Sequence, residues 1–400
     1  MIQQMLTLKA ESPLALHQRR ASEQFGPTLD YLPGSTVRGA LASLYLAGES
    51  ERAGDRLFRE LFLSENVCFS DFLPGGGQGL TQLYPATAAA CKRFDDHALT
   101  DSLLRLELAR EMESSCPLEL DNWGECPDCR SEDLAGKRDR IEPGYYLSVV
   151  NPARVRLRKR MVTGTAIERA TGTAAHAMLF SHEVIEESSA EEEVLFRGVV
   201  TAHDDRLRLA LRDVAPYRQR LAVGYGRSRG LGQLSVHGWD SPPVEREALA
   251  ERWATLNRAA EVLWGRFDRK PDGHYFSLTL QSHLALENPA GEPVLGEVTA
   301  TDLGLPAEAT RCRSVLSAVA VPGWNAAQGL PKADMWALRR GSVLLFRLPP
   351  EADTAPTLDR LAQVEEQGAG LRRNEGFGRA IACDPFHYYF LQRELEGVAR

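Results

Sequence analysis

The sequence predicts an α+β protein built from two related halves. Its 400 residues are more than one ordinary hydrophobic core organises. A glycine- and arginine-rich stretch occurs twice, at 224–236 and at 368–379, and the stretch 6–16 resembles 278–286 with two residues fewer. An internal duplication is the simplest explanation of both repeats, and chance recurrence of short strands and Gly/Arg turns is the alternative.

Each glycine-rich stretch lies between a predicted helix (within 206–220 and 359–367) and a predicted strand. This order is the reverse of a dinucleotide fingerprint or P-loop, in which the glycines precede a helix. Glycines let the backbone approach a ligand with exposed N–H groups, and arginines add charge suited to a phosphate chain. We therefore expect contacts to a nucleic-acid backbone from Gly224, Gly226, Arg227, Ser228, Arg229, Gly230 and Gly232, supported by Arg372, Arg373 and Arg379.

A third candidate contact lies at the start of a predicted helix. Pro33-Gly34 ends an extended segment, and Ser35 is a natural N-cap for the apolar stripe that follows. Free N–H groups near Ser35 and Thr36, with Arg38 in the first turn, would suit a phosphate. A well-capped helix without any ligand would show the same pattern.

Positive charge is concentrated within an acidic chain. The formal net charge is −8, which argues against a protein that coats nucleic acid indiscriminately. Five cations nevertheless fall within seven positions, and alternation would place the first three on one face of a strand: Arg154, Arg156, Arg158, Lys159 and Arg160. The run is either a contact surface for RNA or a solvated face.

The spacing of the cysteines predicts a structural zinc site. Cys126 and Cys129 form a C-x-x-C motif, in which both thiolates can reach one tetrahedral Zn²⁺. Cys116 is the nearest third ligand and Cys91 the best fourth, with His97 as the substitute for Cys91. No thioredoxin-like context surrounds the motif, so zinc is favoured over a redox role, and free thiols are the remaining alternative.

No stretch approaches the 18 apolar residues that a membrane span requires, and the N-terminus lacks a basic region followed by an apolar run. We therefore expect a cytoplasmic protein that does not contact a membrane.

Several of these segments resemble a known family. The segment 32–41 is similar to the Pro-Gly-Ser, basic, Gly helix signature of the RAMP superfamily of CRISPR-associated proteins. The loop 224–232 resembles that superfamily's glycine-rich loop, and 164–185 resembles a segment common in its type III members. With two such halves and cysteines between the first helix and the basic run, the chain most resembles the large RAMP subunit of type III-D effector complexes, which holds the 5′ handle of the guide RNA (crRNA).

This resemblance implies two ferredoxin-like (RRM-like) βαββαβ domains in tandem. The first would span 1–238 with a Cys-rich, zinc-binding insertion at about 85–140, the second 273–400, and a linker helix would lie within 239–272. The implied partners are the crRNA 5′ handle, the large polymerase-like subunit and the backbone RAMP subunits, with target RNA contacted indirectly. The sequence lacks an aromatic RNP1-type run, so we expect backbone contacts from loops rather than base stacking on the sheet.

We expect a noncatalytic RNA-binding subunit that serves antiviral defence. The alternative is a metal-independent endoribonuclease that processes CRISPR repeat RNA. His17, which follows the first strand beside two arginines, would then be the general acid or base. A purely structural subunit, whose loops contact only neighbouring proteins, is the third possibility.

Overall fold

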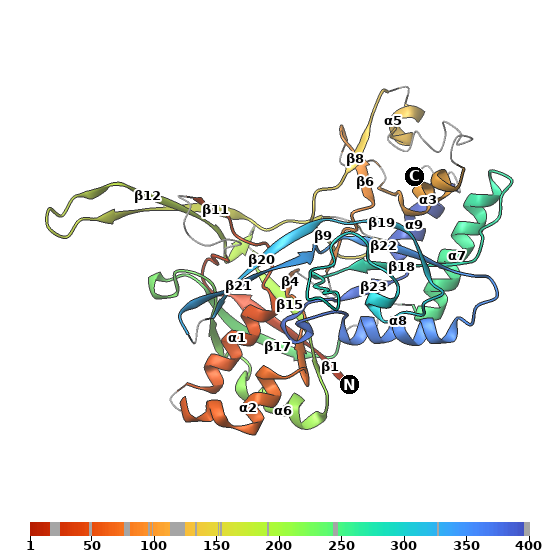
Figure 1. Ribbon diagram of the computed structural model, residues 1–400. Helices are drawn as coiled ribbons and strands as arrows, with labels where there is room; N and C mark the ends of the chain where they lie inside the picture. Colours follow the sequence, from red (N-terminus) through yellow and green to blue (C-terminus); the bar gives the residue numbers. More distant parts are fainter. Residues whose placement is uncertain are drawn as a thin grey trace.

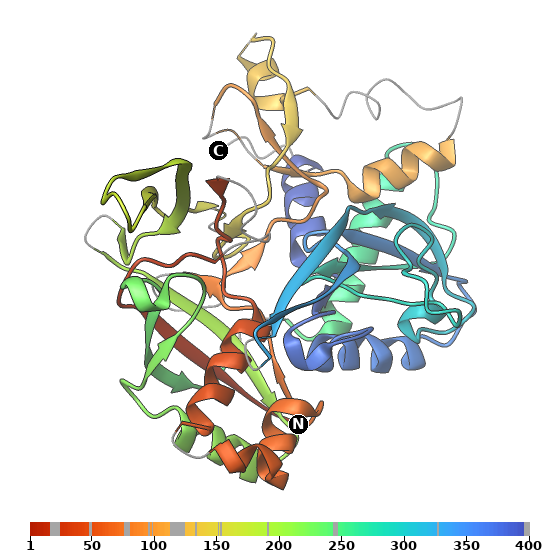
Figure 2. The same cartoon turned by 60° about the vertical axis from the view of Figure 1, so that its left-hand side comes forward.

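The computed structural model is a mixed α and β structure with antiparallel sheets (Figure 1). It describes residues 1–16, 25–47, 50–75, 81–94, 97, 99–112, 125–132, 134–150, 152, 154–189, 192–242, 247–325 and 328–395. Figure 2 shows the two halves as separate lobes, with the Cys-rich stretch above them. None of the helices in these ranges combines the length and apolar character that crossing a membrane requires.

The first half is built on one sheet whose strands lie in the order β16-β17-β1-β15-β3. Their bounds are β1 (Ile2–Ala10), β3 (Val67–Phe69), β15 (Leu195–Ala202), β16 (Arg220–Ala222) and β17 (Gln233–Asp240), and β4 (Leu73–Pro74) also pairs with β15. Helices α1 (Gly34–Tyr45) and α6 (Asp205–Val214) share one apolar core with this sheet. The helix predicted within 206–220 ends earlier, at Val214, because Pro216 follows the C-cap residue Ala215 and the chain then turns into β16.

The second half has a sheet in the order β19-β22-β18-β23. Its strands are β18 (His274–Leu280), β19 (Thr310–Val315), β22 (Val343–Leu348) and β23 (Ala380–Ala382). The two sheets share a strand order. If β1, β3, β15 and β17 of the first half and β18, β19, β22 and β23 of the second are each numbered 1 to 4 along the chain, both sheets have the spatial order 4-1-3-2. Between β18 and β19, where the first half has α1, the fully described stretch holds only the short helix η6 (Thr301–Leu303).

Four helices pack into the apolar core of the second half: α3 (Leu103–Met112), α7 (Leu249–Gly265), α8 (Ala355–Gln367) and α9 (Pro385–Leu395). Helix α7 lies within the predicted linker range and buries Trp253, Leu256 and Leu263 in this core. Helix α3 comes from the Cys-rich stretch but also packs here. The proposed domain boundaries themselves stay a prediction.

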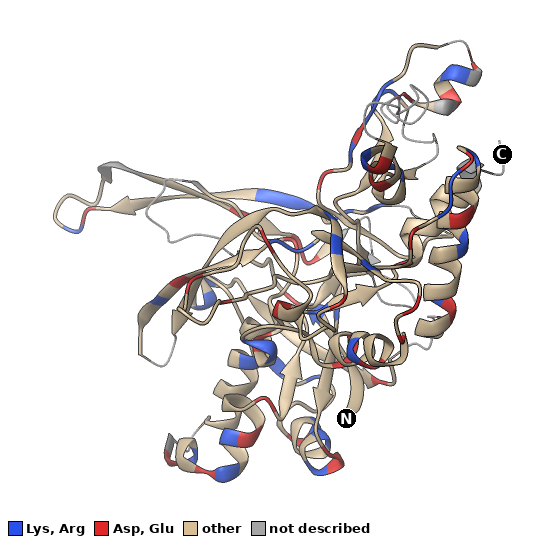
Figure 3. Ribbon diagram, turned by 45° about the vertical axis from the view of Figure 1, so that its right-hand side comes forward, with Lys and Arg blue, Asp and Glu red and all other residues tan. Residues whose placement is uncertain are grey.

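Two hairpins project from the same side of the molecule (Figures 1 and 3). The longer pairs β11 (Lys159–Ile167) with β12 (Ala174–Ile185), and the shorter pairs β20 (Ala318–Asn325) with β21 (Leu330–Leu338). The predicted strand over the basic run is interrupted, since β10 (Arg154–Val155) is separated from β11 by three residues outside any strand.

Short elements complete the described chain. The strands are β2 (Phe25–Gly26), β5 (Gln82–Leu83), β6 (Ala88–Cys91), β7 (Thr100–Asp101), β8 (Arg138–Arg140), β9 (Tyr145–Tyr146), β13 (Ser188–Ser189) and β14 (Glu192–Glu193). The helical turns are η1 (Ser50–Gly54), α2 (Arg56–Phe58), η2 (Arg59–Leu63), α5 (Pro127–Ser131), η5 (Arg227–Arg229) and η7 (Arg373–Glu375).

Candidate metal centre and nucleic-acid interface

The two glycine-rich loops are built in the same way. In the first, the Tyr225 N–H donates to Ala15 O (2.9 Å) and the Gly232 N–H to Pro13 O (2.9 Å). In the second, the Leu371 N–H donates to Ala285 O (2.9 Å) and the Gly378 N–H to His283 O (2.8 Å). Each loop therefore folds over the segment that follows the first strand of its own half.

Glycine is required where these loops pass close to other backbone. Gly224 has a φ of +70°, and a Cβ there would lie 2.4 Å from Ala15 O. Gly370, 146 positions later, has a φ of +71° and would place a Cβ 2.2 Å from Ala285 O. The same offset aligns Arg229 in η5 with Glu375 in η7. The two loops therefore carry opposite charges at equivalent positions, and their surroundings differ.

The first glycine loop is open to solvent. Residues 227–230 are exposed, so Arg227, Ser228 and Arg229 lie on the surface. The Arg229 guanidinium lies 5.6 Å from the ring centroid of Tyr225, and that ring lies 4.7 Å from the ring of His182. Burial and the neighbouring Arg229 hold the pKa of His182 below its usual value, which favours the neutral imidazole in this contact.

His182 links this loop to the basic run. It lies on β12 opposite Val162 of β11, two residues beyond Arg160. The cations Arg154, Arg156, Arg158, Lys159 and Arg160 are all exposed, and Figure 3 shows a band of Lys and Arg at the base of the hairpin. The buried His182 thus links the loop to the strand pair that carries part of the basic run, and we call these residues together the basic track (residues 154–160, His182 and 225–230).

A small pocket opens beside the basic track. Its volume is about 240 Å³, and its lining is Asp30, Gly144, Tyr145, Arg154, Val155, Arg156, Leu157 and Lys159.

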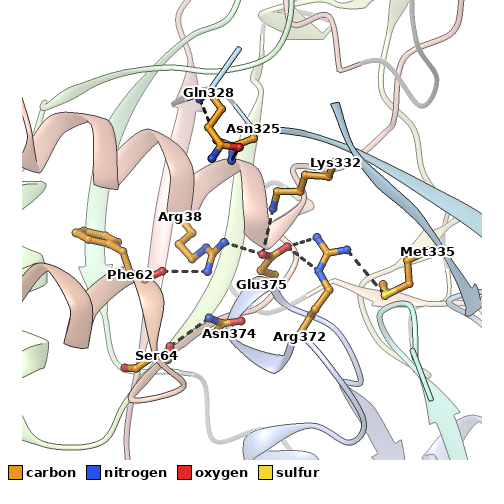
Figure 4. Close-up of polar contacts among 10 residues, drawn as sticks. All are labelled: Arg38, Phe62, Ser64, Asn325, Gln328, Lys332, Met335, Arg372, Asn374 and Glu375. Carbon is orange, nitrogen blue, oxygen red and sulfur yellow. Dashed lines mark hydrogen bonds and ion pairs between the residues drawn. The ribbon is translucent and has the colours of Figure 1, made fainter. Parts of the chain in front are cut away.

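The second glycine loop instead docks against the first half (Figure 4). The Glu375 carboxylate accepts hydrogen bonds from Arg38 of α1 (2.7 Å), Lys332 of β21 (3.2 Å) and Arg372 of the loop itself (2.9 Å from Nε). Asn374 Nδ2 donates to Ser64 O (3.2 Å), and Arg373 pairs with Glu65. We call this contact the junction (Arg38, Lys332, Arg372, Arg373, Asn374 and Glu375).

Contacts within the protein change the interpretation of four predicted RNA contacts, three of them at the junction. Arg38, Arg372 and Arg373 have carboxylate partners within the protein. Arg379 is 8% exposed and donates to Thr201 Oγ1 (3.0 Å) and Glu365 O (3.2 Å), so its guanidinium has no open surface. The α1 end is also crowded, because a Cβ at Gly34 would lie 2.9 Å from Glu375 O. Ser35 and Thr36 remain partly exposed.

Four buried side chains form a cluster that could hold a metal ion: Cys91, His97, Cys126 and Cys129. Their ligand atoms all lie within 4.8 Å of one another, with Cys91 Sγ 3.6 Å from Cys129 Sγ and His97 Nδ1 3.3 Å from Cys126 Sγ. Ligands of a tetrahedral zinc site lie roughly 3.3–3.8 Å apart, given bond lengths of about 2.0–2.3 Å. The donor set and its spacing therefore suit zinc.

Local backbone structure brings these ligands together. Cys91 ends β6, while Cys126 and Cys129 flank the first turn of α5, where the Arg130 N–H donates to Cys126 O (3.0 Å). The Cys126 N–H donates to Gly136 O (3.0 Å), which holds the turn against the following segment. His97 lies beside Cys91 rather than in its place. Cys116, the predicted third ligand, and His17, the candidate general acid or base, both lie outside the described residues.

Comparison with protein families shows which family this chain belongs to. A family model described as the RAMP superfamily matches residues 7–235, more than half of the chain. The chain belongs to the RAMP superfamily. No curated protein matches this RAMP protein.

Solved structures also resemble this RAMP protein, at low sequence identity. One, titled as type III-B Cmr-beta bound to cognate target RNA, is 14% identical over 85% of this chain and 86% of that chain, with a TM-score of 0.42. Another, the Csm3-Csm4 subcomplex in the type III-A CRISPR-Cas interference complex, is 12% identical over 86% and 94%, with a TM-score of 0.36. Similarity at this level carries no argument about function.

Because of the junction, we expect the folding stability of this RAMP protein to depend on Glu375. We expect Glu375→Gln to lower the free energy of unfolding by about 3 kcal/mol, because the change leaves partly buried guanidinium groups without their acid. Urea unfolding followed by circular dichroism measures the effect. Glu193→Gln, which breaks the surface pair with Lys9, is the matched control and should cause no measurable change. Equal midpoints for wild type and Glu375→Gln would contradict the assignment.

The difference in stability between wild type and Glu375→Gln should also depend on pH. Burial alone would raise the pKa of Glu375, but the ion pairs with Arg38 and Arg372 outweigh it and hold the pKa below its ordinary value of 4.5. The carboxylate therefore stabilises the fold at pH values above about 4.5, and this contribution disappears as the pH falls through the lower folded-state value. The difference in urea midpoint between wild type and Glu375→Gln should shrink below pH 4.5; a difference that grows there would count against the junction.

Proposed function

We propose that this RAMP protein is a noncatalytic RNA-binding subunit of a type III CRISPR effector ribonucleoprotein. In this role it holds the 5′ handle of the crRNA for antiviral defence. The observation that carries the proposal is the basic track, because it joins an open glycine loop to five exposed cations through the contact between Tyr225 and His182.

The physical chemistry of the track suits an RNA backbone. Arg227 and Arg229 present guanidinium groups, which bind phosphates with directed, charge-assisted hydrogen bonds. The partly exposed Tyr225 ring, which packs against the buried His182, adds a ring surface beside those charges, and the segment 154–160 adds five exposed cations. Because the formal net charge of the whole chain is −8, RNA binding would require a surface on which cations are clustered, as they are here.

The proposed partners are the large polymerase-like subunit and the backbone RAMP subunits, with target RNA reached through the crRNA. Exposed apolar side chains on the hairpins support an assembly role, since large apolar groups on a surface often mark contact sites. These side chains are Met161, Ile167 and Leu179 on the longer hairpin and Trp324, Leu330 and Trp336 on the shorter one.

We also infer the architecture behind this role: two tandem ferredoxin-like domains and a zinc-binding stretch between strands of the first. The shared strand order 4-1-3-2 and the matching glycine loops support the tandem domains. The Cys₃His cluster supports structural zinc, which would hold β6 and α5 together and take no part in chemistry.

Loss of charge from the open loop should weaken RNA binding. Arg227→Ala combined with Arg229→Ala should reduce affinity for the crRNA handle by at least about 10-fold, because two charge-assisted contacts are lost. The slope of log affinity against log salt should fall by roughly 1.4. Fluorescence anisotropy over a salt titration measures both quantities.

The matched control removes the same charge elsewhere. Arg269→Ala combined with Lys270→Ala changes two exposed cations after α7, away from the basic track, and should leave both affinity and slope unchanged. Unchanged binding by the Arg227 and Arg229 variant would remove the loop from the site. Specific cleavage of a labelled repeat transcript that His17→Ala abolishes would instead support an endoribonuclease.

The zinc assignment predicts one Zn²⁺ per chain. Cys126→Ser should lose the metal and lower the melting temperature, since a structural site contributes directly to folding. Elemental analysis of protein purified from zinc-supplemented culture measures the content. Cys312→Ser, a change outside the cluster, should retain one zinc. Zinc-free wild-type protein that melts at the same temperature would contradict the assignment.

A further inference from the structure

The pocket beside the basic track has a lining that suits one particular type of ligand. Three segments form it, contributing Asp30, Gly144-Tyr145 and residues 154–159. Its volume of about 240 Å³ is below the range of about 300–1,000 Å³ that is usual for drug-sized ligands. The pocket therefore has room for a ligand the size of a single ring system, but not for a whole nucleotide cofactor.

Cations surround this pocket, and one of them is free. Arg154 Nη2 donates to Pro143 O (3.1 Å), and its side chain lies so close to Gly144 that a Cβ there would be 2.8 Å from Nε. Lys159 Nζ donates to Thr28 O (3.3 Å). Arg156 is exposed, and its side chain forms no hydrogen bond or ion pair with a residue in the described ranges. Its guanidinium is thus available for a phosphate at the mouth of the pocket.

Asp30 is the one acid in the lining, and only one of its two carboxylate oxygens, Oδ1, accepts a hydrogen bond from the described part of the chain. The Tyr145 hydroxyl donates to Asp30 Oδ1 (2.7 Å), which orients the carboxylate. Tyr145 is 3% exposed, and its burial, with a further contribution from Asp30, raises the pKa of the phenol well above its usual value, so the hydroxyl stays a donor. No donor from the described part of the chain lies against Oδ2. A carboxylate oxygen accepts hydrogen bonds, and because Asp30 is only partly buried, Oδ2 can accept one from a ligand in place of water.

We propose that this pocket binds one unpaired nucleobase of the bound RNA and that Asp30 selects a base with an exocyclic amino group over uracil. Cytosine, adenine and guanine each offer such an amino group to Oδ2. Uracil has a carbonyl oxygen where cytosine has its amino group, so a uracil held in the same position as cytosine would place that oxygen, and no donor, against Oδ2. Arg156 binds the adjoining phosphate, so affinity and base selection come from different side chains. This assignment rests on the proposed RNA-binding function.

Cytosine and uracil provide the sharpest test, because they have the same size and differ at that amino group. Fluorescence anisotropy with eight-nucleotide oligo(C) and oligo(U) RNA should show that the full chain prefers oligo(C) by roughly 10-fold or more, the loss expected for one hydrogen bond to a charged group. Asp30→Asn should reduce the preference to near unity, because the amide can donate to the uracil oxygen. Asp268→Asn, the same change on the turn after α7, is the control and should retain the preference.

A second variant separates selection from affinity. Arg156→Ala should weaken binding of both oligonucleotides by the same factor and leave their ratio unchanged. Equal affinity of the wild-type chain for oligo(C) and oligo(U) would overturn the base-selecting pocket while leaving RNA binding intact. A preference that survives Asp30→Asn would overturn the role of Asp30. Failure of the wild-type chain to bind either oligonucleotide would count against the proposed RNA-binding function itself.

Discussion

The position of the Glu375 carboxylate among Arg38, Lys332 and Arg372 is the constraint on which the arrangement of this protein depends. A carboxylate that is about nine-tenths buried is costly unless cations and hydrogen bonds compensate for the lost hydration. Here the compensation comes from both halves of the chain, since Arg38 belongs to α1 and the other two cations to the second half. The ion cluster therefore fixes one half against the other, and the close approach of Gly34 to Glu375 O leaves little room for movement at that contact.

This constraint explains why two loops with the same backbone hydrogen bonds lie in different surroundings. Both glycine loops fold over their own first strands with equivalent hydrogen bonds, but the first carries Arg229 where the second carries Glu375. An acidic residue at that position draws the second loop into the protein, against the cations of α1 and β21. An arginine at the same position keeps the first loop solvated and available to an anionic ligand. The opposite charge at the equivalent position thus distinguishes a loop that contacts the other half from a loop that stays exposed.

Patterns local in the sequence predicted much of the fold and site, whereas contacts between distant residues were not visible. Helical spacing and glycine-rich turns indicated α6, α8 and the strands that follow each loop, and the C-x-x-C motif with Cys91 indicated three of the four clustered ligands. The sequence did not reveal that Glu375 neutralises Arg38, because 337 positions separate them and an acid beside two arginines looks like a solvated run. Nor did it reveal the pocket at Asp30, whose lining comes from three separated segments. The sequence offers His97 only as a substitute for Cys91, whereas the fold places both side chains in the cluster.

In the function proposed above, RNA contacts the basic track and not the second glycine loop. Photocrosslinking to single-stranded RNA that carries 4-thiouridine, followed by peptide mass spectrometry, tests this claim most directly. The account predicts crosslinked peptides that contain Tyr225 or residues 154–160, with none from residues 372–376 at the junction. Crosslinks concentrated on 372–376, with the track unmodified, would contradict it.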